Sequence, residues 1–141
     1  MTASTLHASG LAIGQSIPPQ ARTFTTVDLV AYGAATWDWH RLHYDVDYAR
    51  SVNLPNVIID GQAYGGVFAK ALIDWAGPRA FIRKLSLKYK SMAFAGDKLV
   101  ATGEVTAIHA DGDHDIVSVT QRLKNGDRVV AEANAQVRLP R

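Results

Sequence analysis

The sequence predicts an α+β fold in which an antiparallel sheet wraps around one long helix. Apolar residues recur at spacings of three and four across residues 63–75, which is typical of a buried helix. From residue 84 to the C-terminal region, apolar and polar residues alternate in runs separated by turn signals, which is typical of half-buried strands. One long apolar helix and such a sheet can bury their apolar faces against each other.

Length and composition indicate one globular domain and exclude several classes of protein. With 141 residues, 48% of them apolar, the chain can bury a sizeable core; residues 11–141 are expected to form the domain and residues 1–10 a flexible tail. The net charge of +2 is small, and the basic residues are spread along the chain; both observations disfavour nucleic-acid binding. There is no cysteine for disulfide or thiolate chemistry. No targeting or membrane-spanning pattern is present, so we expect a cytoplasmic protein.

Two helices are predicted before the central one. Thr25 and Asp28 have the spacing of a capping box, and the helix that they begin should run to about residue 35. A loop follows over residues 37–44. Asp45 is placed to cap a short helix over residues 46–52, which the segment 53–56, containing Pro55, then ends.

The central helix should begin with Asp60 as its cap and Gly61 in its first turn. Gly77 and the proline after it should end the helix. Two adjacent glycines, at positions 65 and 66, weaken the helix, and we interpret them as a place where its backbone packs closely against the sheet.

The remaining chain predicts four strands. The first places Leu85, Leu87 and Tyr89 on one face and ends before a turn at residues 96–97. The others cover residues 99–108, 116–123 and 129–139, separated by a turn at residues 110–113 and a tight hairpin at residues 125–126. Such a sheet has open edges that attract another chain, so a dimer is expected.

The most informative side chains for function are Asp38 and His43, five residues apart in the loop after the first helix. A carboxylate and an imidazole so placed can hold one water molecule between them, although many surface loops also carry an Asp and a His. His7, His109 and His114 have no spacing that suggests a metal site, and no metal is expected.

The residues around this pair resemble the MaoC-like hot-dog-fold family of (R)-specific enoyl-CoA hydratases and dehydratases, collinearly over residues 11–139. The family has a pattern of roughly Gly-Asp-x-Asn-Pro-aliphatic-His, followed by Asp and Tyr-Ala. The residues in register with it here are Asp38, Leu42, His43, Asp45, Tyr48 and Ala49.

Several positions depart from the family pattern. Trp37, His40 and Arg41 replace its Gly, Asn and Pro, and Asp60 stands before Gly61 where the family commonly has His-Gly. Residues 74–78 and 103–107 resemble more narrowly the small catalytic subunits of heteromeric hydratases that act on steroid-derived acyl-CoA chains.

The resemblance implies a hot-dog fold and a hydro-lyase of lipid metabolism that reversibly hydrates an α,β-unsaturated acyl thioester. Asp38 is expected to deprotonate water, and His43 to bind the same water and relay the proton; the reverse assignment stays open. The Gly61 amide would receive the thioester carbonyl. The residues expected to contact substrate are Trp37, His40, Arg41, Asp60 and Gln62.

The implied substrate is an acyl-CoA or acyl-carrier-protein thioester, with coenzyme A as part of the substrate and no separate cofactor. The implied partner is a second copy or a different hot-dog subunit, with no nucleic acid and no membrane. Plainer interpretations exist: His40 also fits a loop histidine with local hydrogen bonds, and Trp37 and Trp39 fit pocket walls or core.

Two other functions remain open. The first is a thioesterase in which Asp60 activates water against the thioester carbonyl. The second is a non-catalytic acyl-binding subunit of a heteromeric hydratase.

Overall fold

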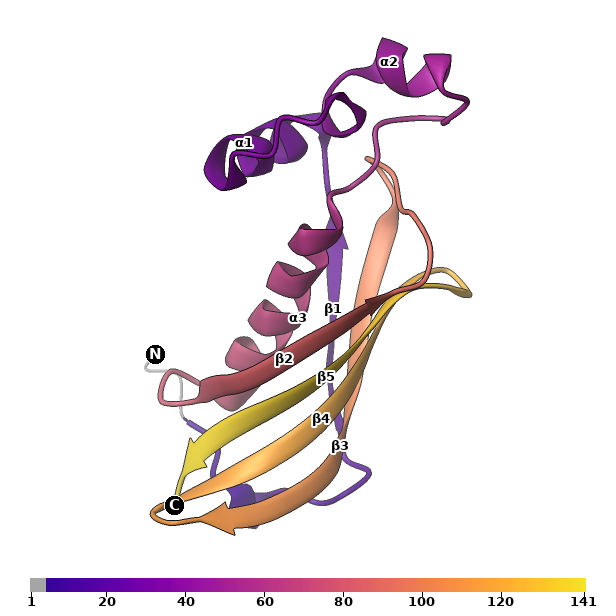
Figure 1. Ribbon diagram of the computed structural model, residues 1–141. Coiled ribbons are helices and arrows are strands. Elements are labelled where there is room, and N and C mark those ends of the chain that lie inside the picture. The colour runs from indigo at the N-terminus through magenta and orange to yellow at the C-terminus, as the bar shows by residue number, and fades with distance from the viewer. Residues whose placement is uncertain (1–4) are drawn as a thin grey trace.

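The computed structural model describes residues 5–141 and shows one long helix lying against a curved five-stranded sheet (Figure 1). The helices are α1 (Thr26–Thr36), α2 (Val46–Ser51) and α3 (Gly61–Ala76), with short 3-10 turns η1 (Ala8–Gly10) and η2 (Arg41–His43). The strands are β1 (Ser16–Thr23), β2 (Phe81–Tyr89), β3 (Lys98–Asp111), β4 (His114–Asn125) and β5 (Arg128–Pro140). This confirms the expected α+β hot-dog arrangement.

The sheet has the strand order β1-β3-β4-β5-β2, and all its pairs are antiparallel. The alternation of the four later strands predicts an antiparallel meander in chain order; β3 to β5 form one, but β2 pairs with β5 and not with β3. Strands β2 and β1 therefore form the two edges. The sequence pattern missed β1, because Pro18 and Pro19 interrupt it. The β1–β3 register shifts between Ile17 and Gln20, around these prolines, and an edge strand is the place where prolines are tolerated.

The core lies between α3 and the sheet. Helix α3 places Phe68 in one buried cluster, which also contains Leu99 and Leu123, and Leu72 in a second cluster, which also contains Leu139. All five side chains are fully buried. Burying a side chain of this size contributes about 1.5 to 3 kcal/mol, so the α3–sheet layer is the main source of stability.

The interpretation of the two helical glycines as tight packing is wrong. A methyl group added to Gly66 would meet nothing within 4 Å, and one added to Gly65 would meet only the Leu87 side chain, at 3.7 Å. Because each glycine in a helix interior costs about 1 kcal/mol relative to alanine, these residues weaken α3 without a steric requirement.

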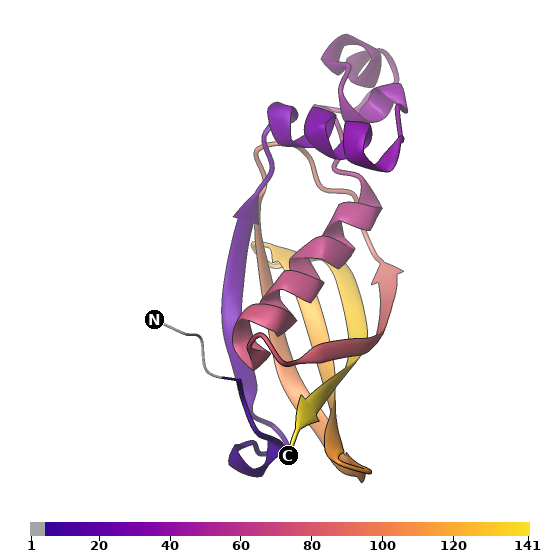
Figure 2. The same cartoon turned by 90° about the vertical axis from the view of Figure 1, so that its left-hand side faces the viewer.

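Residues 24–60, which we call the overhang, carry α1, η2 and α2 above the N-terminal end of α3 (Figure 2). The predicted capping box at Thr25 and the Asp45 cap are both present. The Ile58 N–H donates to the Leu42 carbonyl at 2.9 Å, and the Ile59 N–H donates to the Ala93 carbonyl at 2.9 Å. These bonds fix the overhang to itself and to the loop between β2 and β3.

Part of the expected N-terminal tail packs onto the domain. The Leu6 N–H donates to the Ala76 carbonyl at 2.9 Å, and Ala8 is buried. Residues 1–4 lie outside the described part of the chain, and the flexibility of the segment stays a prediction. Over residues 5–141, no helix has the length and apolar character needed to cross a membrane.

Candidate active site

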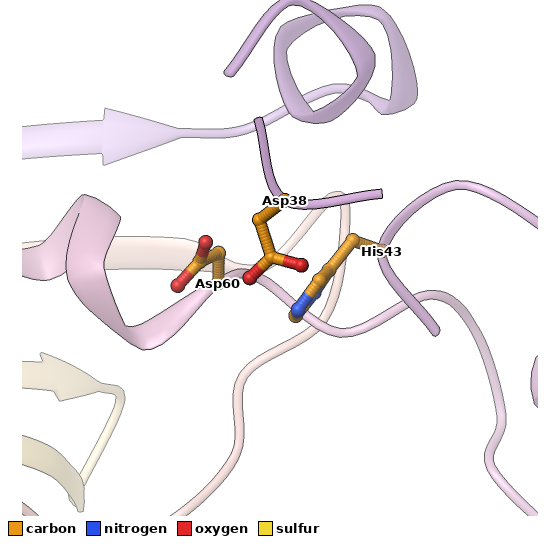
Figure 3. Close-up of side chains that lie close together, drawn as sticks. All are labelled: Asp38, His43 and Asp60. Carbon is orange, nitrogen blue, oxygen red and sulfur yellow. The ribbon is translucent and has the colours of Figure 1, made fainter. Parts of the chain in front are cut away.

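Three side chains converge where the overhang meets α3: Asp38, His43 and Asp60 (Figure 3). One polar atom from each lies within 4.8 Å of one atom from each of the others. Asp38 and His43 are half-buried, and Asp60 is 6% exposed. Oxygen and nitrogen donors of this kind also bind divalent cations, and the expectation that no metal is needed stays a prediction.

Asp38 is positioned by the way in which α1 ends. Trp37 adopts a left-handed conformation (φ 61°) as the helix C-cap, and the Asp38 N–H then donates to the Gly33 carbonyl at 3.1 Å. A Cβ on Gly33 would lie 2.8 Å from the Asp38 carbonyl oxygen, so this position requires glycine. Sequence reasoning missed Gly33, although a glycine in the last turn of a helix, four residues before the C-cap Trp37, was a visible signal.

His43 is oriented by the backbone of the segment that leads into α3. Its Nδ1 lies 2.9 Å from the Ile58 carbonyl oxygen. Because a carbonyl oxygen only accepts hydrogen bonds, Nδ1 carries the hydrogen. In the neutral ring, Nε2 therefore has the free lone pair, so His43 can accept a proton at that atom.

Asp60 has two different oxygen environments. Its Oδ1 accepts the Gln62 N–H at 2.8 Å, which caps α3 as predicted. Its Oδ2 is buried and has no hydrogen-bond partner among the described residues. A buried acceptor without a partner is unfavourable, so this oxygen needs a donor that the described residues do not supply.

Gly61 begins α3, and its N–H is among the first-turn amides that have no intrahelical acceptor. A Cβ at this position would approach the Tyr89 ring to 3.1 Å, so glycine lets the ring cover the start of the helix.

Tyr32 lies near enough to Asp60 for the Asp60 charge to act on its hydroxyl, and sequence reasoning did not identify it. Burial raises the pKa of the Tyr32 hydroxyl, and the neighbouring charges of Asp60 and Tyr89 raise it further. The hydroxyl therefore keeps its proton near neutral pH and remains a hydrogen-bond donor at the edge of the site.

The other residues expected to contact substrate lie further out. His40 accepts the Leu42 N–H at its Nδ1 (3.2 Å), the local bonding of a loop histidine, and its ring centre lies 6.1 Å from that of His43. Arg41 donates to Asp45 at 2.7 Å and lies over the Tyr48 ring. The Asp45 hydrogen bond raises the pKa of the Arg41 guanidinium.

The two tryptophans of the loop are on the surface. Trp37 is 81% exposed and meets Trp39 edge to face, with ring centres 6.3 Å apart, so neither belongs to the core. Gln62 is exposed apart from its capped amide. Substrate contact by these residues and by His40 and Arg41 stays a prediction.

Comparison with known proteins places the chain among relatives of this architecture. The chain is 31% identical over 110 residues to the 3-oxo-4,17-pregnadiene-20-carboxyl-CoA hydratase beta subunit of Mycobacterium tuberculosis, covering 78% of this chain and 84% of the relative. The crystal structure of an (R)-hydratase from A. caviae involved in PHA biosynthesis superposes with a TM-score of 0.86 at 27% identity, over 94% of this chain and 100% of the other.

A heteromeric complex shares the fold. A chain of the ChsH1–ChsH2 complex from Mycobacterium tuberculosis superposes with a TM-score of 0.81 at 24% identity, over 91% of this chain and 98% of the other. Residues 9–127 match the family described as the MaoC like domain. With most of its length matched by that family, the chain belongs to the MaoC-like domain family.

Proposed function

We propose that this protein reversibly hydrates an α,β-unsaturated acyl thioester to the 3-hydroxyacyl thioester, with Asp38 and His43 acting on the water. The observation that carries the proposal is the convergence of these two side chains at the N-terminal end of α3 (Figure 3). The hydratase names of its relatives support the same reaction class.

Hydration needs a hydroxyl group added to the β-carbon and a proton added to the α-carbon. A water molecule between Asp38 and His43 can donate one hydrogen to the carboxylate and the other to Nε2 of His43. The tautomer set by the Ile58 carbonyl supports Nε2 as a proton acceptor. We therefore assign His43 as the group that takes the proton and returns it to the α-carbon, with Asp38 orienting the water. This is the reverse of the assignment first expected.

Charge that develops on the thioester oxygen needs a donor. The Gly61 N–H lies at the positive end of the 16-residue α3 helix and is assigned to this oxygen. Removal of a donor of this type costs roughly 3 to 4 kcal/mol of transition-state stabilisation in enzymes where it has been measured. The donor is a backbone group, so no side-chain substitution removes it directly.

The reaction is tested by mixing purified protein with a series of enoyl-CoA substrates. We expect the ultraviolet absorbance of the enoyl group to fall, with no release of free thiol. With a saturating concentration of a 3-hydroxyacyl-CoA, the reaction should run in reverse and the enoyl absorbance should rise. No absorbance change with any member of the series, in either direction, would reject the hydratase proposal.

One observation keeps a second function in consideration. The buried Asp60 carboxylate lies beside Asp38 and His43 and has one oxygen, Oδ2, without a partner among the described residues; it is the group that a thioesterase would use to activate water. We expect Asp60→Asn, which keeps the shape and the helix cap, to lower hydration less than substitution of Asp38 or His43 does. Loss of all activity in this variant, with thiol release from saturated acyl-CoAs by the unaltered protein, would instead establish a thioesterase.

We also propose assembly with a second hot-dog subunit. The two edges of the sheet differ, and the difference indicates which edge contacts that subunit. Pro18 and Pro19 remove two N–H groups from edge strand β1, whereas the nine residues of β2 contain no proline. We therefore expect β2 to pair with a second chain, identical or different. Light scattering coupled to gel filtration should give at least twice the 15.3 kDa chain mass for a homodimer. A fully active species of chain mass would contradict this assembly.

A further inference from the structure

We infer that Asp38, His43 and Asp60 form a binding site for a divalent transition-metal cation of the Zn²⁺ type, and that this cation and the hydration reaction exclude each other. The cation site is independent of the proposed function, whereas the inhibition rests on it. One oxygen or nitrogen atom from each side chain lies within 4.8 Å of the atoms from the other two (Figure 3). Over residues 5–141 this is the only group of three histidine or acidic side chains so closely placed.

Each of the three side chains uses one polar atom to bind the backbone. Oδ1 of Asp38 accepts the His40 N–H at 3.2 Å. Nδ1 of His43 and Oδ1 of Asp60 have the backbone partners described above. Hydrogen bonds of this kind are usual around metal ligands, because they orient the ligand atom and make it more basic. The atoms that remain for a ligand are Oδ2 of the two carboxylates and Nε2 of the imidazole.

The charge of the group favours a cation as its ligand. Asp60 is 6% exposed, and its Oδ2 is buried without a hydrogen-bond partner among the described residues. Asp38 places a second carboxylate beside it, and across residues 5–141 neither carboxylate belongs to an ion pair. Two neighbouring carboxylates, one of them buried, are unfavourable without a counter-charge, and a divalent cation supplies that charge.

The donor atoms select the class of cation. An imidazole nitrogen suits zinc and the other late first-row ions, whereas Mg²⁺ and Ca²⁺ prefer oxygen ligands alone. Three protein ligands leave a fourth position for water, as in the zinc sites of enzymes. Ligands around a tetrahedral ion with bonds of about 2.1 Å lie roughly 3.4 Å apart, so binding should draw the three side chains slightly closer together.

A bound cation would block the proposed hydration. The lone pair of Nε2 of His43 would be committed to the ion and could not accept a proton from water. Water on a metal ion can itself act as a nucleophile in enzymes. However, no free imidazole would remain to return the proton to the α-carbon. The cation and the reacting water therefore compete for the same atoms.

The binding test titrates the metal-free full chain with zinc chloride by calorimetry, without substrate. We expect one strong site per chain, which binds Zn²⁺ at least about a hundredfold more tightly than Mg²⁺. Asp60→Asn and His43→Gln should each weaken zinc binding by about a hundredfold or more, since losing even an outer hydrogen bond costs about 10- to 100-fold in metal affinity. Circular dichroism checks that each variant is folded, and either variant alone is sufficient for the test.

Asp45→Asn is the matched control for these variants. The Asp45 carboxylate also accepts a backbone N–H of the overhang, from Tyr48, but it is paired with Arg41. The same chemical change at this position should leave zinc binding unaltered.

The activity test adds zinc chloride to the enoyl-CoA assay. Zinc should inhibit hydration with an inhibition constant equal to the calorimetric Kd, excess EDTA should restore the rate, and magnesium at the same concentration should have no effect. In Asp60→Asn, which keeps Asp38 and His43, inhibition should need about a hundredfold more zinc.

Three results would overturn the inference. The first is the absence of a strong zinc site, and the second is hydration that requires the ion. The third is zinc binding that is equally strong in Asp60→Asn and His43→Gln, which would show an adventitious ion only, held by surface groups. Zinc bound at this site by a protein that hydrates no enoyl-CoA would reject the proposed function and retain the cation site. Hydration by a protein that binds no zinc would do the opposite.

Discussion

The overhang and the α3–sheet body differ in how far they rely on the burial of large apolar side chains. The body buries large apolar side chains such as Leu72 and Leu123 completely, in a continuous layer. The overhang adds a few apolar side chains, such as Leu29 and Val57, to one of these clusters. It presents Asp38 and His43 half-buried and positions them with caps, a left-handed turn and hydrogen bonds to the backbone. The difference indicates that stability belongs mainly to the body and that chemistry belongs mainly to the overhang and its junction with α3. Substitutions in the two regions should therefore separate activity from stability.

The largest effect is expected from the pair in the overhang. Asp38→Asn and His43→Gln should each lower hydration turnover by at least about a hundredfold, the scale of positioned acid–base groups. Circular dichroism and the urea midpoint should remain those of the unaltered protein. A folded variant of either kind with nearly normal turnover would remove that residue from the proposed mechanism.

The opposite behaviour is expected in the body. Leu123→Ala opens a cavity in the cluster that also contains Phe68 and should lower the free energy of unfolding by about 2 to 5 kcal/mol. Turnover at low temperature, where the variant is still folded, should change little. Urea denaturation at fixed protein concentration gives the first quantity and the enoyl assay the second. A large loss of turnover in the folded variant would show that the two regions are not separable.

A substitution at Gly33, where the α1 backbone positions the catalytic Asp38, should have a smaller effect on activity. Gly33→Ala brings a methyl group to 2.8 Å from the Asp38 carbonyl oxygen, so the turn that presents Asp38 must shift. We expect turnover to fall by about tenfold, because misplacing a catalytic group by a fraction of its bonding distance weakens its action. Gly65→Ala is the same chemical change without such a contact and should retain activity; equal turnover in the two variants would contradict the positioning role.

The smallest expected effect is a loss of local stability in α1 and α2 at acid pH. The Thr25 backbone N–H holds the pKa of Asp28 below its ordinary value of 3.8, and the Tyr48 backbone N–H, followed by Arg41, does the same for Asp45. A carboxyl group with a lowered folded-state pKa stabilises the fold above the unfolded value, and this stabilisation is lost as pH falls through the folded value. Amide exchange in α1 and α2 should therefore quicken, after correction for intrinsic rates, as pH falls below 3.8, before α3 responds.

The control for this acid response is Asp45→Asn, which keeps a capping side chain but has no carboxyl group to titrate. It should remove the response of α2 and leave that of α1. Simultaneous loss of protection in α2 and α3 would show that the overhang does not open separately.

The sequence by itself determined the features that depend on neighbouring residues. The period of α3, its Asp60 cap, the Thr25 capping box, and the hairpins of β3 to β5 all follow from contacts within a few positions, which propensity and spacing record. The spacing of Asp38 and His43 was visible for the same reason.

Only the tertiary structure decided the features that depend on distant partners. Strand β1 exists because β3 offers it an edge despite Pro18 and Pro19. Asp60 joins the pair because α3 docks beneath the overhang, and the tautomer of His43 comes from a carbonyl fifteen residues away. Gly66 was misread because local pattern shows that a glycine weakens a helix but not whether the space beside it is filled. Burial and unpaired polar atoms are properties of the packed chain, and no spacing along the sequence records them.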